Sequence, residues 1–324
     1  MKRLILLLGW FFFLALPAFA VQVVTGSYTG NGADNRNITI SPACQPLAVF
    51  IQRSDAAWIG QVYFSSMSTN SSGEFTGTAQ AQADRIQQFN SDGFQLGTQS
   101  YVNSNGSDYR YAALCDNGAN DIAVGTYAGN ASDNRDITIS PAFSPEFVAI
   151  ITSTSTYTAW RGANSHTGDS ASIFNVANAE VSNYIQAFNV NGFQVGTGFN
   201  ANTINYYYLA IKGSASGVAT GSFTGNATDN RDITAPNFQP KLVFIKGNSA
   251  TSKVASRFGN TGDASFCGDN AEAADIIQSL IATGFQVGTS SCSNENAVAM
   301  RWAAFTDVSA AADASFGFYR RRVR

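Results

Sequence analysis

A motif of 14 residues decides the fold, and it first reads Gly26-Ser-Tyr-Thr-Gly-Asn-Gly-Ala-Asp-Asn-Arg-Asn-Ile-Thr39. It returns as Gly125-Thr-Tyr-Ala-Gly-Asn-Ala-Ser-Asp-Asn-Arg-Asp-Ile-Thr138 and as Gly221-Ser-Phe-Thr-Gly-Asn-Ala-Thr-Asp-Asn-Arg-Asp-Ile-Thr234. The copies start 99 and then 96 residues apart. Self-similarity at such a period indicates one structural module used three times. We therefore expect any function to lie on repeated surfaces rather than in one assembled active site.

Three further landmarks recur in each repeat. A proline followed by an apolar run, at 46–51, 145–151 and 240–245, predicts a buried strand. Asp92-Gly93 and Asn191-Gly192, flanked by alternating apolar residues, predict hairpins. A closing strand carries alternate aromatic residues on one face, which we expect to be core. Seven or eight short strands per repeat predict an all-β chain of three tandem antiparallel β-sandwich modules.

The first twenty residues are typical of a signal peptide. Lys2 and Arg3 precede an apolar run at 4–16, and a small-residue cleavage signal ends at Ala20. We then expect modules at 21–123, 124–217 and 218–310, and a basic tail at 311–324. Because linkers such as 213–217 are short, the modules are expected to form a stiff rod.

Export places the chain in an oxidising compartment, where disulfides form. Two cysteines fall in the first repeat and two in the third, with none in the second. Four cysteines allow three pairings, and the even split favours Cys44–Cys115 and Cys267–Cys292.

Composition limits the partners. Charged residues make up 13% of the chain, and the formal net charge is −3. Nucleic-acid binding needs a basic stripe, so that class is not expected. After residue 20 no apolar stretch reaches the ~18 residues of a transmembrane helix, so we expect a secreted or cell-surface protein without one. Arginines at 320, 321, 322 and 324 suggest a solvated tail, or alternatively a retention tag or a contact with anionic lipid.

The landmarks together resemble a known repeat family. They are the opening motif, the Pro-x-x-Val-x-Ile strand, the Gly-Phe-x-Leu/Val-Gly-Thr hairpin and the closing aromatic strand with Ala-Ala, and they cover 24–308. This pattern is similar to the tandem β-sandwich repeats of bacterial exported proteins and phage tail-fibre or virion-surface proteins. The resemblance implies that the sandwiches are lectin-like or jelly-roll-like. It also implies surface display or fibre building, with receptor or glycan contact, and it supplies no catalytic residues.

The Asp-Asn-Arg cluster of the motif allows two interpretations. It gathers oxygen atoms, which calcium binds in groups of six to eight. Asp and Asn also favour β-turns, in which the arginine pairs with a neighbouring carboxylate. Calcium is the candidate cofactor, and its candidate ligands are Asp34, Asp133, Asp136, Asp229 and Asp232.

Aromatic residues are the second candidate site. Trp58 and Trp160 occupy equivalent positions when the repeats are aligned by letter, and Tyr157 and Arg161 lie nearby. Flat aromatic faces can stack on sugar rings, although a tryptophan in a sandwich strand is more often core. These four residues are the candidate ligand site.

Catalysis has little support in the sequence. His166 is the one histidine, and its neighbours Ser165 and Asp169 do not make a triad by adjacency alone. We expect a non-enzymatic, tail-fibre-like adhesive protein that binds a surface glycan or cell-surface receptor through repeated weak sites. The alternative is a structural subunit of an extracellular fibre, appendage or matrix, which would self-associate along exposed strand edges.

Overall fold

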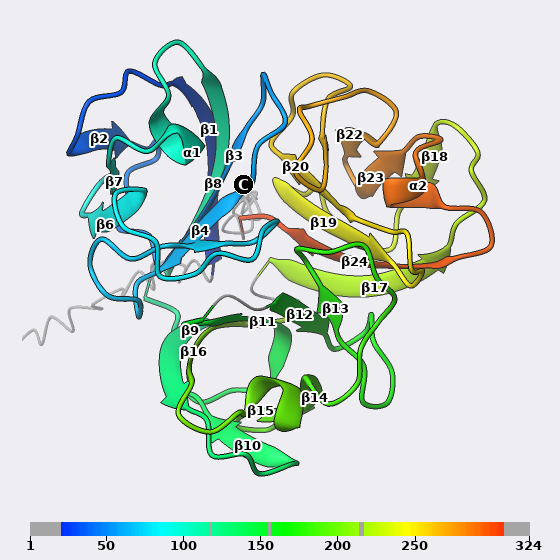
Figure 1. Cartoon of the computed structure of the whole chain (residues 1–324). Helices are drawn as coiled ribbons and strands as arrows, with labels where there is room; N and C mark the ends of the chain where they lie inside the picture. Colours follow the sequence, from blue (N-terminus) through cyan, green and yellow to red (C-terminus); the bar gives the residue numbers. More distant parts are fainter. Residues whose placement is uncertain (1–20, 117, 155–156, 214–216, 308–324) are drawn as a thin grey trace, which may run out of the picture.

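The computed structural model describes residues 21–116, 118–154, 157–213 and 217–307 (Figure 1). The segment interpreted as a signal peptide, the basic tail at 311–324 and positions 214–216 of the second linker lie outside the described residues. Each module pairs a five-stranded with a three-stranded sheet, and every strand pairing is antiparallel. The predicted all-β fold of three sandwich modules is confirmed.

The first module has the large sheet β1-β8-β3-β4-β5 and the small sheet β2-β7-β6. Its elements are β1 (Val21–Thr29), β2 (Arg36–Thr39), β3 (Ala48–Arg53), β4 (Gln61–Phe64), β5 (Gly73–Glu74), β6 (Ile86–Asn90), β7 (Gly93–Leu96), α1 (Ser100–Asn103) and β8 (Asp108–Asp116).

The other two modules repeat this order, with large sheets β13-β12-β11-β16-β9 and β17-β24-β19-β20-β21. The second contains β9 (Ile122–Ala128), β10 (Arg135–Thr138), β11 (Pro145–Thr152), β12 (Thr158–Gly162), β13 (Ser172–Ile173), β14 (Ile185–Asn189), β15 (Gly192–Val195), η1 (Thr197–Phe199) and β16 (Asn205–Lys212). The third contains β17 (Val218–Thr224), β18 (Arg231–Ile233), β19 (Leu242–Gly247), β20 (Val254–Phe258), β21 (Phe266–Cys267), β22 (Ile277–Ile281), β23 (Gly284–Val287), α2 (Ser291–Asn294) and β24 (Ala299–Phe305).

The predicted hairpins are present in all three modules. β6 and β7 pair from Asn90 opposite Gly93, and β14 and β15 pair in the same way from Asn189 opposite Gly192. Gly93 has a φ of 155°, and an added Cβ would lie 2.0 Å from the backbone oxygen of Ile38. Glycine is needed there for both its conformation and its lack of a side chain.

Both faces of the large sheets are buried. In β11, Val148 and Ile150 belong to the core between the two sheets of their own module. Ala149 lies between them and points the opposite way, into a cluster that contains residues of all three modules. β19 repeats this alternation, with Val243 in its own core and Phe244 in the shared cluster.

The shared cluster sits where the three modules meet. The Phe244 ring of the third module lies 5.3 Å from the Phe50 ring of the first and 5.2 Å from the Phe174 ring of the second, measured between centroids. Figure 1 shows the three modules arranged around this centre. The expected rod is therefore wrong. A rod would leave one apolar face of each large sheet in water, and a closed ring buries all three faces.

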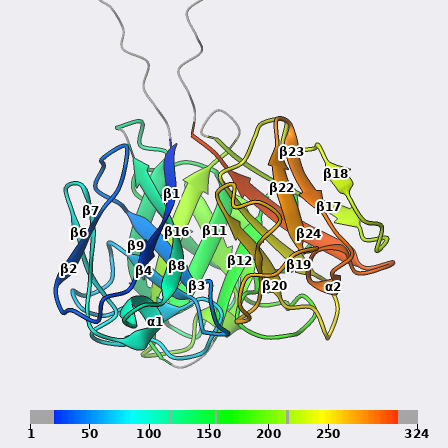
Figure 2. The same cartoon turned by 90° about the horizontal axis from the view of Figure 1, so that it is seen from above.

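The ring closes between the first and third modules. The backbone N–H of Val23 donates to the carboxylate of Asp307 over 2.6 Å, so the two ends of the described chain lie side by side (Figure 2). The expected boundary between residues 123 and 124 falls inside β9, because the first module ends with β8 at Asp116. The second expected boundary coincides with the start of β17 at Val218.

Candidate functional site

The ring has two different ends. Residues 21 and 307 lie at one end, together with the last residues of β8 and β16 and the first residues of β9 and β17. We call this the terminal end. The opposite end carries the loops after the first strand of each module, at 30–35, 129–134 and 225–230, with α1, η1 and α2 beside them. It also carries the connections from β3 to β4, β11 to β12 and β19 to β20. We call this the loop end.

The Asp-Asn-Arg motif builds the turns of the loop end. Asn35 adopts a left-handed φ of 56°, as the β-turn interpretation requires. The guanidinium of Arg36 donates to the backbone oxygen of Thr29 over 2.7 Å and to Oδ1 of Asn103 over 3.0 Å. Asn103 is fully buried in α1 and donates back to the backbone oxygen of Ala33.

The second and third modules repeat this network through their own motif arginine and buried asparagine. Arg135 and Asn200 form it in one, and Arg231 and Asn294 in the other. The motif thus holds the loop, the short helix and the first strand together.

The candidate calcium ligands are engaged within the protein. Asp34, Asp133 and Asp229 each accept a hydrogen bond from the glutamine amide of the neighbouring hairpin, over 2.8 to 3.0 Å. Asp136 and Asp232 point outward from the small sheets, toward Gln194 and Gln286. Across the described ranges, no three His, Cys, Asp or Glu side chains gather in a way that could hold a metal ion. Calcium binding stays a prediction.

Trp160 is not a ligand platform. Its side chain is fully buried in β12, where it stacks on Phe147 and lies against His166. Strand register also separates it from Trp58. Trp160 pairs with Ala149 of the second module. The equivalent of Ala149 in the first module is Phe50, and it pairs with Val62, so Val62 and not Trp58 occupies the position of Trp160. The predicted equivalence of Trp58 and Trp160, which followed from the shared Ala-Trp dipeptide, is therefore wrong, because the loop before β4 and the loop before β12 differ.

Arg161 is likewise an internal residue. It is 7% exposed, and its guanidinium donates to the backbone oxygens of Ser170 and Gly168. Burial lowers the pKa of Arg161 from its usual value. Arg257 holds the corresponding loop of the third module in the same way, through the oxygens of Ala264 and Gly262. The guanidinium donors of Arg161 therefore hold a loop of the protein. The prediction that Arg161 is a ligand-binding residue is thus wrong.

Trp58 and Tyr157 are the candidate ligand residues that reach the surface, and both lie at the loop end. Trp58 is half-buried, with the Tyr101 ring 5.5 Å away and the Arg53 guanidinium 5.5 Å above its own ring. Tyr157 is 38% exposed and lies 6.3 Å from Tyr184. The first two modules therefore each present an aromatic pair beside the loops.

His166 is buried within the second module. Its Nδ1 lies 2.7 Å from the Ser165 hydroxyl, and its Nε2 lies 2.9 Å from the Ser172 hydroxyl. Burial is the main cause that holds the pKa of His166 well below its usual value, with the nearby Arg161 adding to the effect. Because Ser165, His166 and Ser172 are each at most 4% exposed, a substrate cannot reach this group in the folded state.

Both expected disulfides are present, Cys44–Cys115 in the first module and Cys267–Cys292 in the third. Such bonds are typical of proteins that mature in an oxidising compartment. In the part of the chain that the structure covers, we find no helix with the length and apolar character needed to cross a bilayer.

Sequence reasoning missed a cavity where the three modules meet at the loop end. It measures about 190 Å³ and is lined by residues of all three modules, including Thr76, Asn175 and Asp269. These three follow β5, β13 and β21 at equivalent positions. The three segments belong to different modules, and no local sequence pattern indicates that they meet. The predicted rod would have placed them far apart.

Comparisons of the chain with protein-family models, with curated proteins and with solved structures give no match. The resemblance to the repeat family of exported and tail-fibre proteins therefore stays a prediction.

Proposed function

We propose that this protein is a non-enzymatic, extracellular adhesive protein that binds a surface glycan or receptor through its loop end. The observation that carries the proposal is the polarity of the ring. Both ends of the described chain leave at the terminal end, and the repeated loops and aromatic pairs gather at the opposite end. A protein held by either terminus would thus present its loop end to a partner.

The chemistry of the loop end supports a carbohydrate partner. Trp58 and Tyr157 offer apolar faces with polar edges, which suit the apolar faces and hydroxyl rims of sugars. Arg53 and Asp55 form an ion pair beside Trp58 at 2.6 Å and add donors and acceptors there. Two such sites on one rigid ring would raise binding to a repeated glycan by avidity, without a tight pocket at either site.

A glycan array with residues 21–324 tests the proposal, run once with calcium and once with a chelator. We expect selective binding that falls at least about tenfold in Trp58→Ala and in Tyr157→Ala. Val190→Ser is the matched control, because Val190 is 78% exposed but lies at the hairpin turn of the terminal end. Binding lost only with the chelator would place the site at the Asp-Asn-Arg turns.

An array without any selective binding would overturn the adhesive proposal. Electron microscopy of the same sample would then test the alternative, a structural fibre or matrix subunit, which predicts filaments.

A further inference from the structure

The cavity at the centre of the loop end arises from one break in the threefold repeat. The residue after β5 is Phe75 and the residue after β13 is Phe174, and both rings fill the centre of the ring. The equivalent residue after β21 is Gly268. Matching backbone hydrogen bonds establish the equivalence. Each of the three residues donates its N–H to the backbone oxygen of a residue just before, or at the start of, the neighbouring strand. The pairs are Phe75 with Gly60, Phe174 with Thr158, and Gly268 with Val254.

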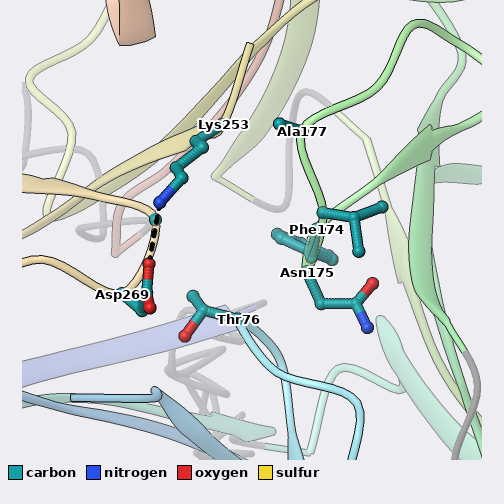
Figure 3. A pocket seen from close by; sticks show the side chains of 8 residues that line it. Thr76, Phe174, Asn175, Ala177, Lys253 and Asp269 are labelled. Atoms are coloured by element: carbon teal, nitrogen blue, oxygen red, sulfur yellow. Dashed lines mark hydrogen bonds and ion pairs between the residues drawn. The ribbon is translucent and has the colours of Figure 1, made fainter. Parts of the chain in front are cut away.

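Gly268 also positions a charged pair at this cavity. It has a left-handed φ of 61°, and a Cβ there would meet Cδ of Lys253 at 2.7 Å. Without a Cβ, the lysine stem lies over the glycine, and its ammonium reaches Oδ1 of Asp269 at 3.0 Å. Figure 3 shows this pair on one side of the cavity, facing Phe174 and Asn175 on the other, with Thr76 between them.

The lining combines an apolar wall with convergent polar groups. Phe174 supplies the wall, and the polar groups are the ammonium and carboxylate of the third module and the Thr76 hydroxyl of the first. Asn175 of the second module also lines the cavity, and its amide donates to the backbone oxygen of Gly77. In small-molecule sites, a few placed polar groups set the orientation of the ligand against an apolar wall. Because the charges of Lys253 and Asp269 cancel, the cavity favours a neutral ligand. Groups that both donate and accept hydrogen bonds match this lining, and hydroxyl groups do both.

The size limits the ligand to one small unit. The cavity volume is about 190 Å³. That is below the ~300 Å³ at which sites for drug-sized ligands begin. A single sugar ring fits this range and an oligosaccharide does not.

We propose that the cavity made by Thr76, Asn175, Lys253, Gly268 and Asp269 binds one neutral monosaccharide unit of a glycan. The ligand class rests on the glycan-binding function proposed above. Asp269 accepts hydrogen bonds from the sugar hydroxyls, and Lys253 and Thr76 donate hydrogen bonds to them. Phe174 borders the apolar face of the sugar. The site exists only in the closed ring, because each module supplies part of it.

Saturation-transfer NMR and calorimetry with methyl glycosides of glucose, galactose, mannose and N-acetylglucosamine test the proposal on the 21–324 chain. We expect one of them to bind, and binding to fall at least about tenfold in Lys253→Ala and in Ala177→Phe, which places a ring at the mouth. Lys212→Ala is the matched control, because Lys212 is an exposed lysine that also forms an ion pair, with Asp121 at 3.1 Å, and it does not line the cavity. Equal melting temperatures would show that each variant folds.

Two results would overturn the inference. One is that none of the four glycosides binds at millimolar concentration, and the other is that Lys253→Ala and Ala177→Phe bind like the parent. If the array still shows binding that depends on Trp58, the inference fails while the adhesive function stands. If the array and the glycosides are both negative, the two proposals fall together.

Discussion

At the scale of the residue, one place between the two sheets is filled in three different ways. In the first module Glu74 pairs with Arg85 at 2.7 Å, with both side chains at most 6% exposed, and the guanidinium lies 3.9 Å above the Tyr101 ring. In the third module the positions of Glu74 and Tyr101 are taken by Cys267 and Cys292, which form the disulfide. The second module has Ile173 and Tyr184 where the first has the ion pair.

These exchanges predict how the ion pair contributes to stability. Arg85→Ala should lower the free energy of unfolding by about 3–5 kcal/mol, because it leaves Glu74 buried without its partner. The double variant Glu74→Ile with Arg85→Tyr, which copies the second module, should recover most of that loss. Urea unfolding measures both. Arg53→Ala is the control and should cost below about 1 kcal/mol, since its ion pair with Asp55 is exposed. A double variant as unstable as Arg85→Ala would contradict the exchange.

Local turn chemistry was predictable from the residues, and long-range pairing was not. Asp-Asn and Asp-Gly indicated turns because these residues adopt left-handed backbone easily, and Asn35 and Gly93 do so. The equivalence of Trp58 and Trp160 failed because strand register is set by partners far along the chain. A shift of one residue moves a side chain to the other face of a sheet.

At the scale of the element, the opening motif of each repeat depends on an asparagine that follows about seventy residues later. Asn103 accepts from the N–H of Asn31 and from Arg36, and it donates to the backbone oxygens of Ala33 and Gly97. All of its hydrogen-bonding groups are thus used inside the protein. The short helix α1 therefore positions the Asn103 side chain against the loop.

Removal of that side chain should weaken the module. Asn103→Ala leaves buried groups of the loop without partners, and each such group costs about 1–3 kcal/mol. We expect a loss of at least about 2 kcal/mol in urea unfolding and faster proteolysis in the 30–35 loop. Asn90→Ala is the control, because Asn90 makes its hydrogen bond with Asn37 on an exposed sheet face. Equal losses in the two variants would show that α1 does not fix the loop.

At the scale of the whole molecule, charge pairs between modules follow the order of the ring. Arg110 of the first module binds Glu272 of the third at 3.1 Å, and Arg301 of the third binds Glu180 of the second. At the remaining interface the equivalent positions hold Tyr207 and Ala81, so both charges are replaced together. No charge is left unpaired at that position.

The apolar runs at 46–51, 145–151 and 240–245 carried a signal for the ring. Strands buried on one face alternate apolar and polar residues, whereas these runs are apolar at nearly every position. They predicted buried strands but not what would cover the second face. The cover is the other two modules, and only their meeting creates the central cavity, so no single repeat contains the information for it.

The ring predicts that the three modules unfold together, and Phe244 tests this. Its ring touches Phe50 of the first module and Phe174 of the second, so Phe244→Ala should cost about 3–5 kcal/mol and keep a single transition. Hydrogen exchange should rise in β4 and β12, outside the mutated module. Phe285→Ala is the control, because Phe285 is equally buried but packs on Trp302 within its own module. Its effect on exchange should be strongest in the small sheet of the third module. Three separate transitions in the parent protein, or exchange in β4 and β12 that Phe244→Ala leaves unchanged, would mean that the shared cluster does not couple the modules.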